Sequence, residues 1–306
     1  MKNTIISNFG LDKLGLSQSD VDFLDVKLEE DNLIFVDYNK ILKFKTPLNR
    51  DMKASLDAFL NGFFQSAFFK RKTESRLLLK GLHECNATRL GYSSNKPHGN
   101  SVGSVLQQLI LENTEFVVDS LKSGQFSYNT LYFGVDQVGP DRISDILVSI
   151  IKPQLILYTQ EQCVKHNIPT TMVKVKSIFN PNKLIWETGK YELPVHDGLP
   201  IIFIPKSITS TDGGLISSYN KFLRYGFRHF VKHNTEYQFL VDENEQGKGV
   251  KKKDYEAYLK DKGIPYKDEV KKWILGDAMS ILNFESELMD DLEEISTAEI
   301  LKTINP

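Results

Sequence analysis

The sequence contains few cysteines and no long apolar run, and both absences narrow the class of protein. Cys85 and Cys163 are the two cysteines in 306 residues, too few for a disulfide framework and without the paired spacing of a zinc site. No stretch approaches the roughly 18 apolar residues of a membrane-spanning helix, and the first residues lack the apolar core of a signal peptide. We therefore expect a cytoplasmic protein that does not enter a membrane.

The chain also lacks an excess of charge of either sign. It has 38 Lys and Arg residues against 40 Asp and Glu residues, a net charge of −2. This balance excludes a strongly basic nucleic-acid coat protein and a disordered acidic tail, but it allows a local basic patch. With 41% apolar residues, a chain of this length can bury the core of one large domain or two ordinary ones.

Apolar spacing predicts that helices dominate. Between Asn49 and Phe68, phenylalanines and aliphatic residues recur at three- and four-residue steps, as on one face of a helix. A second amphipathic helix is predicted from Val102 to Gly124, and we expect the two to pack together. Ser144 or Asp145 is the predicted N-cap of a further helix, which Pro153 either kinks or divides.

Short strands complete the predicted fold. One or two are expected between Asp20 and Lys45, and the apolar segment from Leu199 to Lys206 is typical of a buried strand. The predicted fold class is α/β or α+β, helix-dominated with a short mixed sheet. Residues 1–210 are expected to form the main α/β domain, and residues 211–306 a mostly helical C-terminal region.

Three carboxylates lie close together where the helix containing Pro153 is predicted to begin: Asp136, Asp141 and Asp145. Hard cations take oxygen ligands, and a bound divalent cation can activate water for phosphodiester hydrolysis. We therefore predict that Asp141 and Asp145 are catalytic residues that bind Mg²⁺, with Arg142 contacting the substrate. In the structural alternative, Asp145 caps the helix and Arg142 pairs with Asp136.

A second group of polar residues lies in the segment HECNATRLGYSSNKPHGNSVG. We expect Glu84 to join the catalytic carboxylates, and Arg89, Gly91 and Tyr92 to contact the substrate. Backbone N–H groups at residues 99–101, where a helix is predicted to start, favour phosphate, so a nucleotide-binding protein is a further hypothesis. In the structural alternative the glycines form a tight turn and Glu84 pairs with Arg89.

Lys206 ends the predicted buried strand and is a fourth candidate catalytic residue. In nucleases of the PD-(D/E)xK type a carboxylate lies two positions before the lysine, but Ile204 occupies that position here, so the motif is broken. A solvent-facing lysine is the alternative. Lysines and aromatic residues alternate between residues 247 and 273, which is typical of a nucleic-acid surface, but interspersed acidic residues favour a solvated helical hairpin.

The chain resembles an uncharacterised family of bacterial proteins associated with antiviral defence loci. The resemblance spans about residues 33–210 and is carried by four blocks: LIFVDYNKIL, HECNATRLGYS, GPDRISD and LPIIFIPKSI. It implies a cytoplasmic bacterial protein with a defence role, and no particular activity. From these blocks we take as candidate site residues Glu84, Arg89, Gly91, Tyr92, Asp141, Arg142, Asp145 and Lys206.

The first functional hypothesis is a metal-dependent nuclease of antiviral defence, or a degenerate relative of one, that acts on nucleic acid. Glu84, Asp141 and Asp145 would converge on Mg²⁺, and Lys206 or Arg142 would contact the scissile phosphate. The alternative is a non-catalytic sensor or adaptor subunit that binds a partner protein of a defence complex. The nuclease hypothesis requires that carboxylates far apart in the chain meet in the folded protein.

Overall fold

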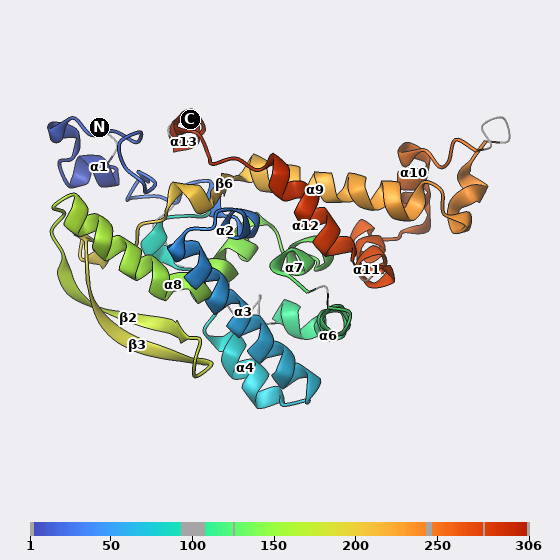
Figure 1. Ribbon diagram of the computed structural model, residues 1–306, viewed down its shortest axis with the longest axis horizontal. Helices are drawn as coiled ribbons and strands as arrows, with labels where there is room; N and C mark the ends of the chain where they lie inside the picture. Colours follow the sequence, from blue (N-terminus) through green and yellow to red (C-terminus); the bar gives the residue numbers. More distant parts are fainter. Residues whose placement is uncertain (1–2, 93–107, 125, 243–246, 278, 305–306) are drawn as a thin grey trace.

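A computed structural model describes residues 3–92, 108–124, 126–242, 247–277 and 279–304 (Figure 1). Helices account for 59% of the protein, and none of those in the described ranges is both long and apolar enough to span a membrane. The helices are α1 (Ile5–Asn8), α2 (Tyr38–Lys43), α3 (Pro47–Phe68), α4 (Lys72–Lys80), α6 (Thr114–Lys122), α7 (Tyr128–Gly134), α8 (Pro140–Lys165), α9 (Asp212–Gly226), α10 (Lys252–Lys262), α11 (Tyr266–Gly276), α12 (Ser280–Asp291) and α13 (Thr297–Ile304).

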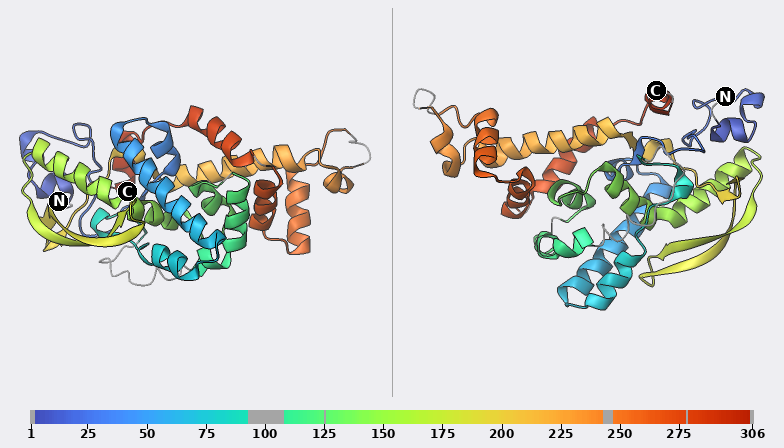
Figure 2. Two further views of the ribbon diagram at one scale, coloured as in Figure 1. Left: turned by 60° about the horizontal axis from the view of Figure 1, so that its bottom comes forward. Right: turned by 180° about the vertical axis from the view of Figure 1, so that it is seen from behind.

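The strands form separate antiparallel pairs. They are β1 (Ile34–Val36), β2 (Thr171–Asn180), β3 (Ile185–Leu193), β4 (Val195–His196), β5 (Leu199–Pro200) and β6 (Thr209–Thr211). β1 pairs with β6, β2 with β3, and β4 with β5. The helix-dominated α+β prediction is confirmed, but the described strands make two-stranded antiparallel sheets and not one mixed sheet. The N-terminal segment and the β2–β3 hairpin lie at one end of the molecule and α10 at the other (Figure 1, Figure 2). A division near residue 210 stays a prediction.

The predicted strand from Leu199 to Lys206 is wrong beyond Pro200. The apolar residues 201–204 are buried as expected, but their backbone groups bond to separate parts of the chain. The Ile202 N–H donates to the Ala87 carbonyl at 2.8 Å, and the Phe203 N–H donates to Thr159 Oγ1 at 2.9 Å. An apolar run of this length shows burial, but it does not show that a neighbouring strand runs alongside.

No second strand follows β1 within the described residues 37–45, because Asp37 caps a helix there. The Asp37 carboxylate accepts from the Asn39 N–H at 2.9 Å, which caps α2, and it accepts from Ser210 Oγ at 2.8 Å. The clustered apolar residues that follow therefore belong to a short buried helix and not to a second strand. The same carboxylate fixes α2 to the β1–β6 pair.

The phenylalanine-rich helix is confirmed as α3. Thr46 caps it, since its Oγ1 accepts from the Asn49 N–H at 3.1 Å. α3 contacts α6, the last part of the helix predicted from Val102 to Gly124, and it also contacts α4 and α8. The described residues 108–112 are helical too, but a turn at Asn113 separates them from α6. α6 ends before Gly124, whose φ of +76° suits glycine.

α8 is one continuous helix that contains Pro153. It begins at Pro140, directly after Gly139, because a proline lacks only an N–H that would be unpaired at the first helical position. The predicted N-cap at Ser144 or Asp145 is therefore wrong, and both residues lie inside the helix. Ser144 Oγ instead accepts from the Val36 N–H at 3.0 Å, which fixes α8 to β1.

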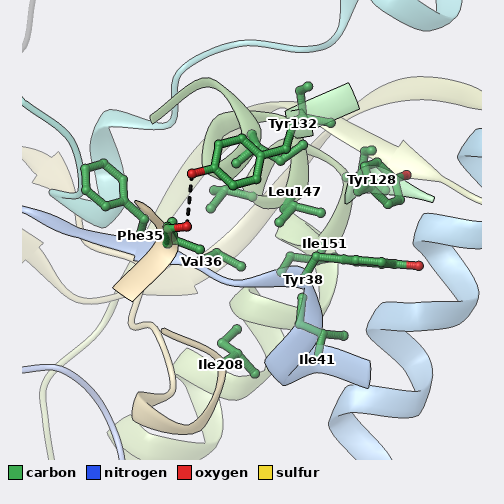
Figure 3. Close-up of a cluster of buried hydrophobic side chains, with 14 of the residues drawn as sticks. Phe35, Val36, Tyr38, Ile41, Tyr128, Tyr132, Leu147, Ile151 and Ile208 are labelled. Atoms are coloured by element: carbon green, nitrogen blue, oxygen red, sulfur yellow. Dashed lines mark hydrogen bonds between the residues drawn. The ribbon is translucent and has the colours of Figure 1, made fainter. Parts of the chain in front are cut away.

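Apolar side chains of β1, α2, α7 and α8 meet in the core around this contact (Figure 3). Four of these side chains are fully buried: Phe35 of β1, Tyr128 of α7, and Leu147 and Ile151 of α8. The Tyr132 hydroxyl donates to the Leu215 carbonyl at 3.1 Å, which joins α7 to α9. The start of α8 is thus held in place on several sides.

The β2–β3 hairpin packs along α8 and ends over α3 and α4. Near its turn, Trp186 Nε1 donates to the Leu78 carbonyl at 2.7 Å. The Trp186 ring lies over Gly81, and Leu184 lies over Gly62, each at a distance that leaves no room for a Cβ atom. Two glycines therefore allow the hairpin to sit against the helices.

We expect the substitution Gly81→Ala to destabilise the protein. The added Cβ would lie 1.9 Å from Trp186 Cδ2, so the ring must move, and overpacking of this kind costs about 1–3 kcal/mol. Thermal or urea unfolding would measure the loss. Gly276→Ala is the matched control, because nothing lies within 4 Å of a Cβ there. Equal stability of the two variants would contradict the packing described.

Candidate functional site

The start of α8 brings three of the predicted catalytic carboxylates together. Asp141 and Asp145 are four residues apart and therefore lie on one face of the helix. Glu84 lies beside this face, because the neighbouring residue His83 is tied to α8: its N–H donates to Ser149 Oγ at 3.1 Å, and its carbonyl accepts from the same hydroxyl at 2.7 Å. The charges of Glu84 and Asp141 both act on Asp145.

Asp31 joins this group, although sequence reasoning missed it. A Cβ placed on Gly91 would lie 3.3 Å from Asp141 Oδ1 and 3.3 Å from Asp31 Oδ2, so the Gly91 backbone passes close to both carboxylates. Gly91 has a φ of +140°, which favours glycine, and its N–H donates to the Asn32 carbonyl at 3.1 Å. We call Asp31, Glu84, Asp141 and Asp145 the acidic cluster.

Asp145 is the most buried member of the acidic cluster. It is 9% exposed, and its Oδ2 atom has no hydrogen-bond partner among the described residues. Burial raises the pKa of Asp145 well above its usual range, and the charges of Asp141, Glu84 and Asp31 raise it further. A buried carboxylate without partners costs free energy unless it is protonated or faces a cation.

The protein's other buried acidic side chains are satisfied by hydrogen bonds. Glu285 accepts from Ser127 Oγ at 2.5 Å and from Asn129 Nδ2 at 2.8 Å. Glu269 accepts from the hydroxyls of Tyr237 and Tyr255 at 2.8 and 2.5 Å, and it also pairs with a lysine. These carboxylates have clear structural partners, so the unpartnered oxygen of Asp145 calls for a different explanation.

Glu84 and Asp141 are also shifted toward the protonated form. Burial raises the pKa of Glu84, with a further contribution from Asp141. Burial likewise raises the pKa of Asp141, and Arg142 opposes this increase. Arg142 donates to the Gln137 carbonyl at 2.6 Å, and no ion pair joins it to Asp136 within the described ranges. The structure thus supports neither the capping role of Asp145 nor the Arg142–Asp136 pair.

Asp136 does not lie with the acidic cluster. It is exposed, and its charge acts on Lys267. Burial lowers the pKa of Lys267 to about 8, although the charge of Asp136 opposes this decrease. Lys267 in turn donates to the Tyr132, Val135 and Val138 carbonyls at the end of α7. Asp136 therefore belongs to the surroundings of this capping lysine, although it is only five residues from Asp141.

Of the predicted substrate contacts, Arg89 and Tyr92 border the acidic cluster together with Gly91. Arg89 is 3% exposed, and its Nε atom has no hydrogen-bond partner in the part of the chain that is described. Burial lowers the pKa of Arg89 and the charge of Asp31 opposes this, and no described ion pair joins Arg89 to Glu84. The expected structural pair of Glu84 with Arg89 is thus not formed.

Tyr92 connects the acidic cluster to the start of α9. Its hydroxyl donates to Asp212, and its ring lies against Phe35, with centroids 5.0 Å apart. Burial raises the pKa of Tyr92, with further contributions from Asp212 and Asp141. Half of the Tyr92 side chain is nevertheless exposed, so an aromatic surface lies open beside the carboxylates.

Lys206 lies in different surroundings. Its Nζ donates to the Gln18 carbonyl at 3.2 Å, its backbone N–H donates to the Asp22 carbonyl at 3.0 Å, and its charge acts on Asp20. It is not among the groups that shift the pKa of Asp145. The structure places Lys206 with the N-terminal loop, and its catalytic role stays a prediction.

Binding of Mg²⁺ by Asp141 and Asp145 stays a prediction. No group of three or more His, Cys, Asp and Glu side chains is arranged to hold a metal within the described ranges. Mg²⁺, however, is usually held by one or two carboxylates, with water and substrate phosphate in the remaining positions. Asp141 and the unpartnered Asp145 oxygen offer such a pair. The predicted phosphate-binding residues 99–101 lie outside the described residues.

We expect Asp145→Asn to alter the pH dependence of stability. The folded-state pKa of Asp145 lies above its unfolded value, so the native state binds more protons between the two pKa values, and stability falls as pH rises through that window. The asparagine should make Tm fall less steeply from about pH 4 upward. Asp119→Asn, at a surface ion pair with Lys122, is the control. An unchanged slope for Asp145→Asn would contradict the unpaired buried carboxylate.

Comparison with known proteins gives one match. Searches of the curated proteins and of the solved structures each found no match. A family model described as "Domain of unknown function (DUF8370)" matches residues 13–217, a span that includes the whole acidic cluster and carries no link to antiviral defence. Because this match covers most of the chain, the protein belongs to the DUF8370 family.

Proposed function

We propose that the acidic cluster is the active site of a metal-dependent nuclease. The observation that supports this most strongly is Asp145, a buried carboxylate with an unpartnered oxygen that faces three further acidic side chains. Such an arrangement destabilises the folded protein unless a proton or a cation compensates it. Proteins keep arrangements of this kind at functional sites more often than elsewhere.

The side chains of the acidic cluster would have different roles in the reaction. Asp141 and Asp145 would hold Mg²⁺, which when bound supplies an activated water and stabilises charge on the phosphate. Glu84 is less buried than Asp145, and burial raises its pKa, which makes it a stronger base than an exposed glutamate and suits a general base. Arg142, in the first turn of α8, would contact a phosphate oxygen.

Tyr92 favours a nucleic acid as the substrate. Its half-exposed ring lies beside carboxylates, and an exposed aromatic ring can stack on an unpaired base at a gain of about 1–3 kcal/mol. The hydrogen bond to Asp212 would hold the ring in position. A single-stranded segment with one base on Tyr92 would bring its backbone near the acidic cluster.

The biological setting stays a prediction from the sequence. A role in antiviral defence and a cytoplasmic location rest on the resemblance described above. The non-catalytic sensor or adaptor also stays open, since a partner protein would meet the same exposed residues. Activity measurements separate these hypotheses.

We expect Asp141→Asn and Asp145→Asn each to lower Mg²⁺-dependent cleavage of DNA or RNA by about 10²-fold or more, as loss of a group that stabilises the transition state does. Neither variant should lose the ability to fold, because neither carboxylate caps α8. Cleavage of labelled single- and double-stranded oligonucleotides would be followed with Mg²⁺, with Mn²⁺ and with EDTA. Asp119→Asn on α6 is the control and should retain full activity.

Two results would count against the nuclease. The first is wild-type protein that neither cleaves any of these substrates nor changes its Tm when Mg²⁺ or Mn²⁺ is added. The second is cleavage that persists in Asp145→Asn at the wild-type rate. Either result would favour the sensor or adaptor hypothesis.

A further inference from the structure

The outward face of the β2–β3 hairpin carries a group of lysines. Residues alternate between the two faces of a strand, and in β2 the side chains of Val173 and Val175 turn toward the core, while Lys174 and Lys176 are exposed. In β3, Tyr191 packs against the core and Lys190 is exposed. One face of the hairpin thus covers α8 (Figure 1). The other face presents Lys174, Lys176 and Lys190 to solvent. We call these three residues the lysine face.

Two of these lysines are directly opposite each other. The register pairs Lys174 with Lys190, so their side chains leave the same face with Cβ atoms about 5 Å apart. Like charges in opposite positions destabilise a strand pair. Within the described residues, none of the three lysines forms an ion pair, although lysines elsewhere on the surface do. The hairpin therefore keeps an uncompensated positive charge.

Few other side chains share this face. Glu192 lies opposite Met172 at the end of the hairpin remote from its turn. Met172 is 57% exposed. A surface with three lysines and little apolar area suits a partner that is recognised by its charge.

The hairpin is rigidly attached to the rest of the protein. Trp186 and Leu184 pack on α3 and α4 near the turn, and a bulge between Val175 and Ile178 interrupts the register. At this bulge Lys152 Nζ donates to the Ser177 carbonyl at 3.2 Å. Lys152 is seven residues along α8 from Asp145, or about 10 Å at 1.5 Å per residue. Lys152 thus joins the bulge, next to Lys176, to the helix that carries Asp141 and Asp145.

We propose that the lysine face binds the phosphate backbone of a nucleic acid. The inference rests on the proposed nuclease, for which it supplies a contact that holds the strand away from the reacting phosphate. The three ammonium groups lie within about one Debye length of each other at 0.1 M salt, so they act together on a polyanion. Because lysines contact phosphates without reading bases, binding is independent of sequence and weakens as salt increases.

The test replaces all three lysines in the variant Lys174→Gln/Lys176→Gln/Lys190→Gln. Binding of labelled single- and double-stranded DNA and RNA is measured by fluorescence anisotropy in EDTA, which prevents metal-dependent cleavage. Each lost phosphate contact lowers the slope of log K against log salt by about 0.7–0.9, so the slope should fall by about 2–3. At low salt, Kd should rise at least tenfold.

The control variant Lys53→Gln/Lys122→Gln/Lys252→Gln has the same net charge. Its lysines lie on α3, α6 and α10, each in an ion pair, and its binding should match that of wild type. The inference is overturned if the lysine-face variant keeps the wild-type slope, if the control loses as much binding, or if wild type prefers anionic lipid vesicles or a polyglutamate peptide to every oligonucleotide.

The result of this binding test does not depend on the result of the cleavage test for the proposed nuclease. Asp145→Asn should bind the oligonucleotides as wild type does while it fails to cleave them. If wild type binds through the lysine face but never cleaves, the surface stands and the nuclease is contradicted. If cleavage depends on Asp145 and the lysine-face variant binds normally, the nuclease stands and the surface is contradicted.

Discussion

The attachment of α8 to β1 determines where the polar groups of this protein meet. Pro140 starts the helix, and Ser144 accepts from the Val36 N–H one turn later. With that bond in place, the face that carries Asp141 and Asp145 points to the segment that contains Glu84, which Ser149 holds through two further hydrogen bonds. The apolar core formed by β1, α2 and α7 keeps this arrangement fixed.

The acidic cluster differs from Glu269 and Glu285 in the hydrogen bonding of its buried carboxylate. Glu269 and Glu285 each receive two or more short hydrogen bonds, whereas Asp145 is surrounded by groups of its own sign. A buried polar group without a partner is costly in the low dielectric of the interior. Tyr92, half of which is exposed, borders the acidic cluster.

Sequence reasoning identified the long helices and most members of the acidic cluster, but it misplaced several details. Periodicity located α3 and α8, since a helical face leaves a repeating pattern, and the density of carboxylates pointed to Asp141 and Asp145. Asp31 gave no local signal, because only the tertiary contact with Gly91 brings it to Asp141. Serine and aspartate are common N-caps, so the sequence favours Ser144 or Asp145 over the actual start of α8 at Gly139 and Pro140. The apolar run at Ile201 indicates burial, but burial alone does not show that a partner strand is present.

The contact of Tyr92 with Asp212 extends the influence of this region across the molecule. Asp212 opens α9, and α9 packs against α11 and α12, so the ring is mechanically linked to the far end of the fold. Loss of this one hydrogen bond would leave the start of α9 held by the Thr211 cap and by the pairing of β6 with β1.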